Sequence, residues 1–211
     1  KEQVINIREL SETYGDYLGN FGERIAVIFG TIAVYSSVIW ITILILRIVI
    51  GFAVEVGCVR YFIKAAEGET DMSNIGYFFK GDRYIGVTLT IILRNIYITL
   101  WTLLLIIPGI IKSYAYRMVP YILADNPTIG YRRAIQLSNE MTQGEKANIW
   151  ILDLSFLGWY ILGTLALLVG VLFIHPYEYA TNAELYLVLR ERAISQGLTS
   201  HEELNITQYK I

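Results

Sequence analysis

Long apolar runs separated by short polar connections dominate this chain. The plainest run, residues 25–46, carries no formal charge between Arg24 and Arg47. As a helix rising about 1.5 Å per residue it would extend roughly 33 Å, enough to cross a hydrocarbon core about 30 Å thick. Further apolar stretches cover residues 48–66, 84–107, 110–124 and 149–189. The pattern predicts an all-α, polytopic membrane protein with six transmembrane helices.

The connections between these spans are expected to be short on one side. The first two spans should turn at Arg47, and the last two near Val169 and Gly170. Residues 110–124 are apolar but short for a span, and they contain Lys112 and Arg117. They could form a tilted fourth span or a re-entrant segment buried among the other helices.

The distribution of basic residues favours the fourth span. With six crossings, most of the 17 Lys and Arg residues fall on the side that holds both termini. By the positive-inside rule, both termini then face the cytoplasm. A five-span arrangement would place the basic residues near the C-terminus on the opposite side, so we expect residues 110–124 to cross.

The polar segments predict short amphipathic helices at the membrane surface. Val4 and Ile7 repeat at helical spacing, and the glycines at positions 15, 19 and 22 are expected to end that helix before the first span. The chain then divides into a cytoplasmic amphipathic N-terminal segment (1–24), a six-span transmembrane domain (25–190) and a cytoplasmic tail (191–211).

A second surface helix is expected to follow the fourth span. Asp125 or Asn126 can cap its start, and Pro127 suits the first turn because no N–H is needed there. One face of the helix is mainly apolar and is formed by Tyr131, Ala134, Leu137, Ser138 and Met141.

Composition and charge narrow the class of protein. Hydrophobic residues make up 55% and charged residues only 17%, against about 25% charged in soluble domains. A net charge of −2 gives no basic surface for nucleic acid. The single cysteine, Cys58, excludes an internal disulfide and a cysteine-rich metal site.

Ionisable groups within the apolar runs are the candidate functional residues, because charge at membrane depth is costly. The candidate intramembrane polar site consists of Glu55, Arg94, Asp153, Glu178 and His175. Arg94 lies near mid-span and requires a partner, which any of the three carboxylates could supply. These groups could line a polar cavity for an ion, a lipid headgroup or a peptide, or form buried pairs that fix helix register.

Catalytic motifs are absent from the sequence. It has no HExxH, no GxSxG, no Walker loop and no dinucleotide-binding fingerprint. His175 has no second His or Cys at ligand spacing, so neither a metal nor another cofactor is expected. An enzyme is therefore less favoured than a non-catalytic protein.

Several motifs resemble one known family. They are Trp101 to Pro108–Gly109, then Asp125–Asn126–Pro127, then Asp153 to Trp159. The chain resembles a family of bacterial integral membrane proteins, common in Firmicutes and classed as a domain of unknown function. It is also distantly similar to the membrane domain of some glycerophosphodiester phosphodiesterases. The resemblance implies a multi-pass protein of the bacterial cytoplasmic membrane and brings no activity. It marks structural signature positions: Pro108, Gly109, Asp125, Asn126, Pro127 and Trp159.

Three functional hypotheses follow from these observations. The first is a non-catalytic integral membrane component, a transport-related or complex-forming subunit that handles lipid or hydrophobic peptide. The second is a membrane-embedded enzyme acting on lipids, with Asp153, Glu55 or His175 as acid or base. The third is a scaffolding homo-oligomer. The expected partners are membrane lipids, other membrane proteins or further copies of this chain, and not nucleic acid.

Overall fold

The computed structural model describes residues 7–79, 82–165 and 169–206. The chain forms two compact units, Lys1–Arg47 and Ile48–Ile211, each of which is described by itself. Every regular element in the described residues is a helix, which confirms the all-α class. Three helices are long and apolar enough to cross a membrane: Glu12–Ala66, Arg83–Leu104 and Lys146–Leu165. They indicate a membrane protein, whereas six transmembrane helices are not found among the described residues.

The first unit contains one long helix, α1 (Ile7–Leu46). The break predicted at Gly15, Gly19 and Gly22 was wrong, because α1 runs through all three. Glycine costs about 1 kcal/mol relative to alanine inside a helix, but it keeps both backbone hydrogen-bonding groups, so isolated glycines need not end it. Residues 1–24 therefore contain no separate surface helix within the described part.

The prediction of a turn at Arg47 was also wrong, because the backbone is helical there. Residues Arg47–Gly51 form a π-helical turn, η1, and α2 (Phe52–Ala66) follows directly. Ile48, Val49 and Ile50 are not turn formers, so the local sequence offers no residue that would reverse the chain before Gly51.

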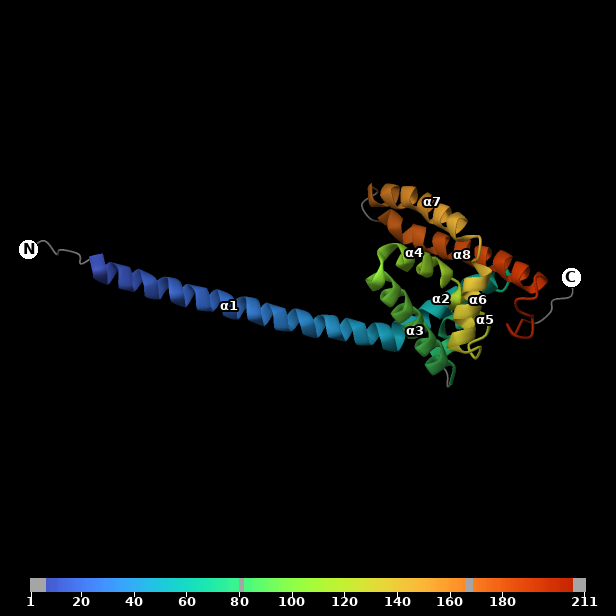
Figure 1. Cartoon of the computed structure of the whole chain (residues 1–211), viewed down its shortest axis with the longest axis horizontal. Helices are drawn as coiled ribbons and strands as arrows, with labels where there is room; N and C mark the ends of the chain where they lie inside the picture. Colours follow the sequence, from blue (N-terminus) through green and yellow to red (C-terminus); the bar gives the residue numbers. More distant parts are fainter. Residues whose placement is uncertain (1–6, 80–81, 166–168, 207–211) are drawn as a thin grey trace, which may run out of the picture. The chain divides into compact units, whose positions relative to one another are not determined.

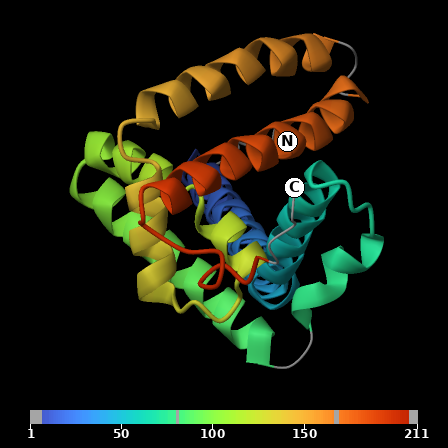
Figure 2. The ribbon, with the colours of Figure 1, turned by 90° about the vertical axis from the view of Figure 1, so that its right-hand side faces the viewer.

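The second unit is a bundle of helices (Figures 1 and 2), which enclose one apolar core. Its core includes Val56, Ile63, Ile122 and Tyr186, all 1% exposed or less. After α2 the elements are η2 (Met72–Phe79, a 3-10 helix), α3 (Asp82–Leu104), α4 (Ile106–Ala115), α5 (Val119–Asp125), α6 (Tyr131–Met141), α7 (Lys146–Leu165) and α8 (Val169–Ser195).

Helices α3 and α4 form a tight hairpin at Leu105, whose backbone is extended. Pro108 lies in the first turn of α4. The N–H groups of a first turn have no partner within the helix, so proline, which has no N–H, costs no hydrogen bond there. A Cβ on Gly109 would lie 2.3 Å from Thr102 Oγ1, so only glycine permits this close approach. The signature pair Pro108–Gly109 therefore starts a helix, while the break itself falls at Leu105.

The single spanning helix predicted over residues 110–124 was wrong. The segment contains two short helices, α4 with 10 residues and α5 with 7, separated at residues 116–118. At about 1.5 Å per residue neither can cross a core about 30 Å thick. Every residue of α5 from Val119 to Ala124 is buried, as expected of a segment enclosed by other helices.

Helix α6 buries Ala134, Leu137, Ser138 and Met141, which confirms most of its predicted inner face. The predicted start of this helix was wrong. Asp125 ends α5, and the Asn126 carboxamide oxygen accepts the N–H of Thr128 at 2.9 Å. Pro127 thus lies in a turn before α6, because Asn126 holds the turn by a local side-chain bond.

Helices α7 and α8 pack side by side as an antiparallel hairpin in both views (Figures 1 and 2). Helix α7 ends at Leu165 and α8 begins at Val169, so Val169 and Gly170, the predicted turn residues, lie in the first turn of α8. A Cβ on Gly170 would lie 2.6 Å from Gly163 Cα, so these two glycines set the spacing of the hairpin. Helix α8 continues to Ser195, beyond the predicted boundary of the tail at residue 191.

Candidate intramembrane polar cavity

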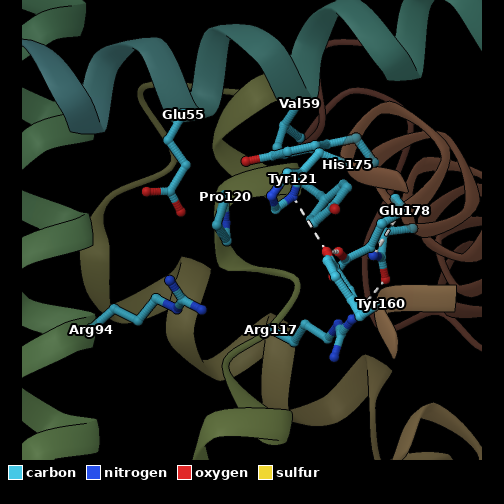
Figure 3. Close-up of a pocket in the computed structure, with 11 residues that line it drawn as sticks. Glu55, Val59, Arg94, Arg117, Pro120, Tyr121, Tyr160, His175 and Glu178 are labelled. Atoms are coloured by element: carbon cyan, nitrogen blue, oxygen red, sulfur yellow. Dashed lines mark hydrogen bonds between the residues drawn. The ribbon is translucent and has the colours of Figure 1, made fainter. Parts of the chain in front are cut away.

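A polar cavity of about 430 Å³ lies inside the second unit, between α2, α3, α5, α7 and α8. Four of the five candidate residues line it, namely Glu55, Arg94, His175 and Glu178 (Figure 3). The other lining residues are Val59, Arg117, Pro120, Tyr121, Tyr160, Tyr179 and Asn182. Charges from helices far apart in the sequence therefore gather around one space.

Arg94 explains part of the break between α4 and α5. Its Nε donates a hydrogen bond of 2.8 Å to the carbonyl of Tyr116, which lies where α4 ends. No carboxylate of the described residues lies within 4.0 Å of Arg94, so the predicted ion pair is not formed. The two terminal amino groups of Arg94 have no hydrogen-bond partner among the described side chains.

Glu55 projects from α2 into the same cavity. Figure 3 shows its carboxylate directed across the space toward the side on which Arg94 lies. Among the described residues, Glu55 has neither a hydrogen bond nor an ion pair. Arg94 and Glu55 thus face each other across the cavity without direct contact.

Asp153 lies outside the lining but is joined to it through Arg117. The two guanidinium amino groups of Arg117 donate to the two carboxylate oxygens of Asp153 at 2.6 and 2.7 Å. Tyr114 donates to the same carboxylate at 3.0 Å. Such a bidentate pair is strongly oriented, and it neutralises Asp153 locally. Sequence reasoning missed this pair because it assigned Arg117 to a span of its own.

Tyr160 joins two candidate residues on α8. Its hydroxyl donates to the carboxylate of Glu178 and lies 3.3 Å from Nδ1 of His175 (Figure 3). The carboxamide of Asn182 donates to the Glu178 carbonyl at 2.9 Å and accepts from Arg117 at 2.9 Å. Sequence reasoning missed Tyr160, since nothing distinguishes it among 16 tyrosines.

Ser138 on α6 satisfies backbone groups that the helix break exposes. Its hydroxyl donates to the Ala115 carbonyl at 2.8 Å and accepts the Met118 N–H at 3.1 Å. Ser138 is fully buried. Buried backbone groups must find partners, so Ser138 permits irregular backbone inside the protein. In the sequence, the sign of this role is that Ser138 lies on a helix face that is otherwise mainly apolar.

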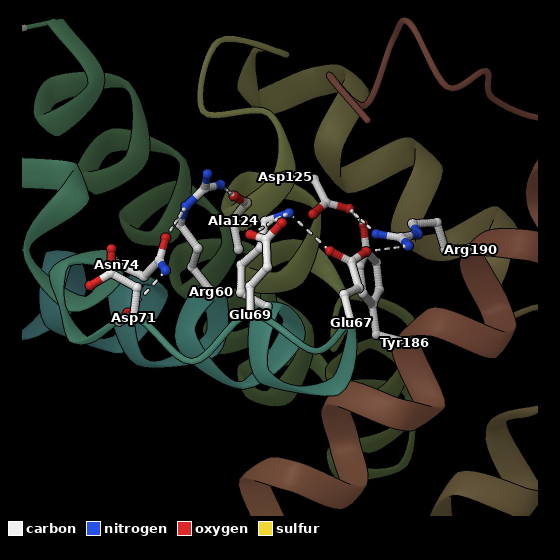
Figure 4. A network of polar contacts seen from close by, with 10 residues as sticks. Arg60, Glu67, Glu69, Asp71, Asn74, Ala124, Asp125, Tyr186 and Arg190 are labelled. Atoms are coloured by element: carbon white, nitrogen blue, oxygen red, sulfur yellow. Dashed lines mark hydrogen bonds and ion pairs between the residues drawn. The ribbon is translucent and has the colours of Figure 1, made fainter. Parts of the chain in front are cut away.

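A network of charges joins the ends of α2, α5 and α8 (Figure 4). Arg190 pairs with Asp125 at 3.1 Å and with Glu67 at 2.7 Å, and Tyr186 donates to Asp125 at 2.7 Å. Lys64 also pairs with Glu67 at 2.9 Å. Although burial alone would raise it, hydrogen bonds from Arg190 and Lys64 keep the pKa of Glu67 below its ordinary value. Asp125 is therefore a network member rather than a helix cap.

The turns after α8 are tied to α5 and α6. Asn126 donates its carboxamide N–H to the Glu203 carbonyl at 2.8 Å, and Arg133 pairs with the Glu203 carboxylate at 2.6 Å. The hydrogen bond from Arg133 lowers the pKa of Glu203. The signature residue Asn126 thus links two distant segments.

Trp159 lies apart from the polar cavity. It is 57% exposed and lines an apolar groove of about 600 Å³ on the α7–α8 hairpin, together with Phe173 and Tyr177. Within the described residues, no group of three His, Cys, Asp or Glu side chains is placed to hold a metal ion.

The fold and the cavity define a class, a helical membrane protein with clustered charges in its interior. Residues 102–193 match the family model described as "Protein of unknown function (DUF975)". This confirms the resemblance to a domain of unknown function. The match includes Arg117, Asp153 and Glu178, whereas Glu55 and Arg94 precede it. Neither a curated protein nor a solved structure matches the chain, so similarity to glycerophosphodiester phosphodiesterases is not shown.

Proposed function

We propose that this chain is a non-catalytic integral membrane component whose cavity receives the polar head of a lipid or hydrophobic peptide. The observation that carries the proposal is the pair of facing charges, Arg94 and Glu55, neither of which has a direct ionic partner. Charges in a medium of low dielectric are costly unless compensated. A bound polar group would compensate them, as expected of a transport-related or complex-forming subunit.

The membrane arrangement proposed here concerns the second unit and has five crossings, formed by α2, α3, α4 with α5, α7 and α8, of which the α4–α5 crossing is discontinuous. Helix α4 starts at the hairpin with α3, and α5 ends at Asp125, which pairs with Arg190 close to Glu67 at the end of α2. This contact supports a return of the chain to the side where α2 ends. Irregular backbone at membrane depth is tolerated where protein buries it, and broken helices commonly border binding sites.

The orientation proposed here places the ends of α2, α5 and α8 on the cytoplasmic side of a bacterial membrane. Lys64, Arg133 and Arg190 belong to the charge networks at the ends of α2, α5 and α8. Excess Lys and Arg marks the cytoplasmic side.

Cysteine labelling tests this orientation. In a Cys58→Ser background, Ser73→Cys and Ser195→Cys should react with a membrane-impermeant maleimide in inverted vesicles and not in intact cells. Leu105→Cys, at the α3–α4 turn, should show the opposite pattern. Labelling of Ser195→Cys in intact cells would contradict the orientation.

Arg94→Gln is the direct test of ligand binding. We expect about tenfold to hundredfold weaker retention of co-purified lipid, since a hydrogen bond to a charged group contributes about 1.5–3 kcal/mol. Native mass spectrometry of the full chain measures the bound lipid. Arg132→Gln is the matched control, because Arg132 is exposed and its guanidinium bonds only Tyr131. Unchanged lipid retention in a folded Arg94→Gln protein would refute the proposal.

A second candidate function is a membrane enzyme that acts on lipids. The observation that favours it is the hydroxyl of Tyr160 between the Glu178 carboxylate and His175. A phenol, a carboxylate and an imidazole within hydrogen-bond reach can exchange a proton. If the purified chain turns over a phospholipid and the Tyr160→Phe substitution abolishes that turnover, the enzyme is favoured. Binding of the lipid without turnover favours the first proposal.

A further inference from the structure

The charges around the cavity define a ligand of mixed sign. We propose, resting on the function proposed above, that the cavity binds a zwitterionic aminophospholipid, with its phosphate at Arg94 and its primary ammonium at Glu55.

The compensated charges are Arg117, Asp153 and, in part, Glu178. Arg117 and Asp153 form a bidentate pair that cancels itself. Glu178 accepts a hydrogen bond from the Tyr160 hydroxyl, which is a neutral donor. Arg94 is then the cation without an ionic partner among the described lining residues, and Glu55 is the anion without a hydrogen bond.

Arg94 is held in a suitable pose for a phosphate. Its Nε is fixed on the Tyr116 carbonyl, so the guanidinium is anchored while both terminal amino groups remain available. Two parallel N–H donors match two phosphate oxygens, and a planar guanidinium fixed at one nitrogen loses little further freedom on binding.

Glu55 provides the complementary site for an ammonium group. Its carboxylate can accept N–H donors of a primary amine, and the rings of Tyr121 and Tyr179 line the same cavity. Aromatic faces attract cations, and Glu178 adds a second negative charge to the lining. A purely anionic head would approach both carboxylates and leave Glu55 uncompensated, whereas a purely cationic head would leave Arg94 uncompensated.

A lipid head suits this arrangement better than a peptide. In an ethanolamine phospholipid, the ammonium and the phosphate are separated by two carbons, so both charges enter one cavity of about 430 Å³. The two charged termini of a hydrophobic peptide lie at opposite ends of the chain. Exposed apolar side chains such as Phe173 and Tyr177 on α8 provide a surface for acyl chains outside the cavity.

The test compares lipid selectivity in the full-length protein. The protein is reconstituted in nanodiscs with equal amounts of phosphatidylethanolamine and phosphatidylglycerol, and the ratio of the two lipids retained by the chain is measured by native mass spectrometry. We expect the wild type to retain phosphatidylethanolamine in about tenfold excess, and Glu55→Gln to lose that excess. Glu184→Gln is the control, because Glu184 is an exposed residue of α8 and does not line the cavity.

The outcomes separate this inference from the proposed function. If Glu55→Gln keeps the wild-type ratio while Arg94→Gln loses both lipids, the zwitterionic ligand is refuted and the lipid cavity stands. If Arg94→Gln retains both lipids as the wild type does, both proposals fail. If a short hydrophobic peptide with free termini displaces the lipid at stoichiometric concentration, the ligand is a peptide and the proposal of a lipid is refuted.

Discussion

Replacement of Arg190 by methionine is expected to lower the free energy of unfolding by about 3–5 kcal/mol. Arg190 is only 5% exposed, and it pairs with Asp125 and Glu67 at once. Methionine fills a similar volume but leaves two carboxylates without their shared cation. The side chain of Asp125 is only 7% exposed, so water cannot readily compensate it.

Thermal or denaturant unfolding in a single detergent measures this effect. Arg192→Met is the matched control, because Arg192 is 45% exposed and pairs with Glu145 at the surface. Surface pairs contribute at most about 1 kcal/mol, so this variant should unfold almost as the wild type does. Equal destabilisation by the two substitutions would show that the Arg190 network does not hold α2, α5 and α8 together.

Ser138→Ala is expected to cost about 2–4 kcal/mol of stability. The substitution removes the hydroxyl that serves the Ala115 carbonyl and the Met118 N–H, both at the break between α4 and α5. Thr142 also approaches the Ala115 carbonyl at 3.3 Å and can compensate one of the two losses only in part. Because Tyr116 lies within this break and anchors Arg94, lipid retention should fall as well.

The control for this prediction is Ser155→Ala on α7. Ser155 is exposed, and its hydroxyl bonds only the Leu152 carbonyl of its own helix. Its loss should change stability by no more than about 0.5 kcal/mol. If Ser138→Ala also unfolds as the wild type does, the backbone at the break must be satisfied in another way, and Ser138 has no part in holding Arg94 in place.

Hydrophobic periodicity predicted the parts of this protein that depend on local chemistry. The apolar runs predicted helices throughout, and the spacing of Ala134, Leu137 and Met141 predicted the buried face of α6. The cost of charge in an apolar run singled out Glu55 and Arg94, and the structure brings both to one cavity. Whether that cavity is functional stays a prediction.

Contacts between distant residues could not be predicted in the same way. The break between α4 and α5 depends on Ser138, which follows Ala115 by 23 residues. Arg190 reaches Glu67 across 123 residues, and a single sequence contains no signal for that pairing. The glycines of α1 predicted a helix end because turn propensity is a local property, whereas a long apolar helix tolerates isolated glycines.

An experimental structure of the full chain in nanodiscs of native lipid tests the lipid cavity most directly. We predict headgroup density between α2 and α3, with a phosphate within hydrogen-bond distance of the terminal amino groups of Arg94 and an ammonium beside Glu55. A direct ion pair between Arg94 and Glu55 that closes the cavity and leaves no room for a headgroup would contradict the account.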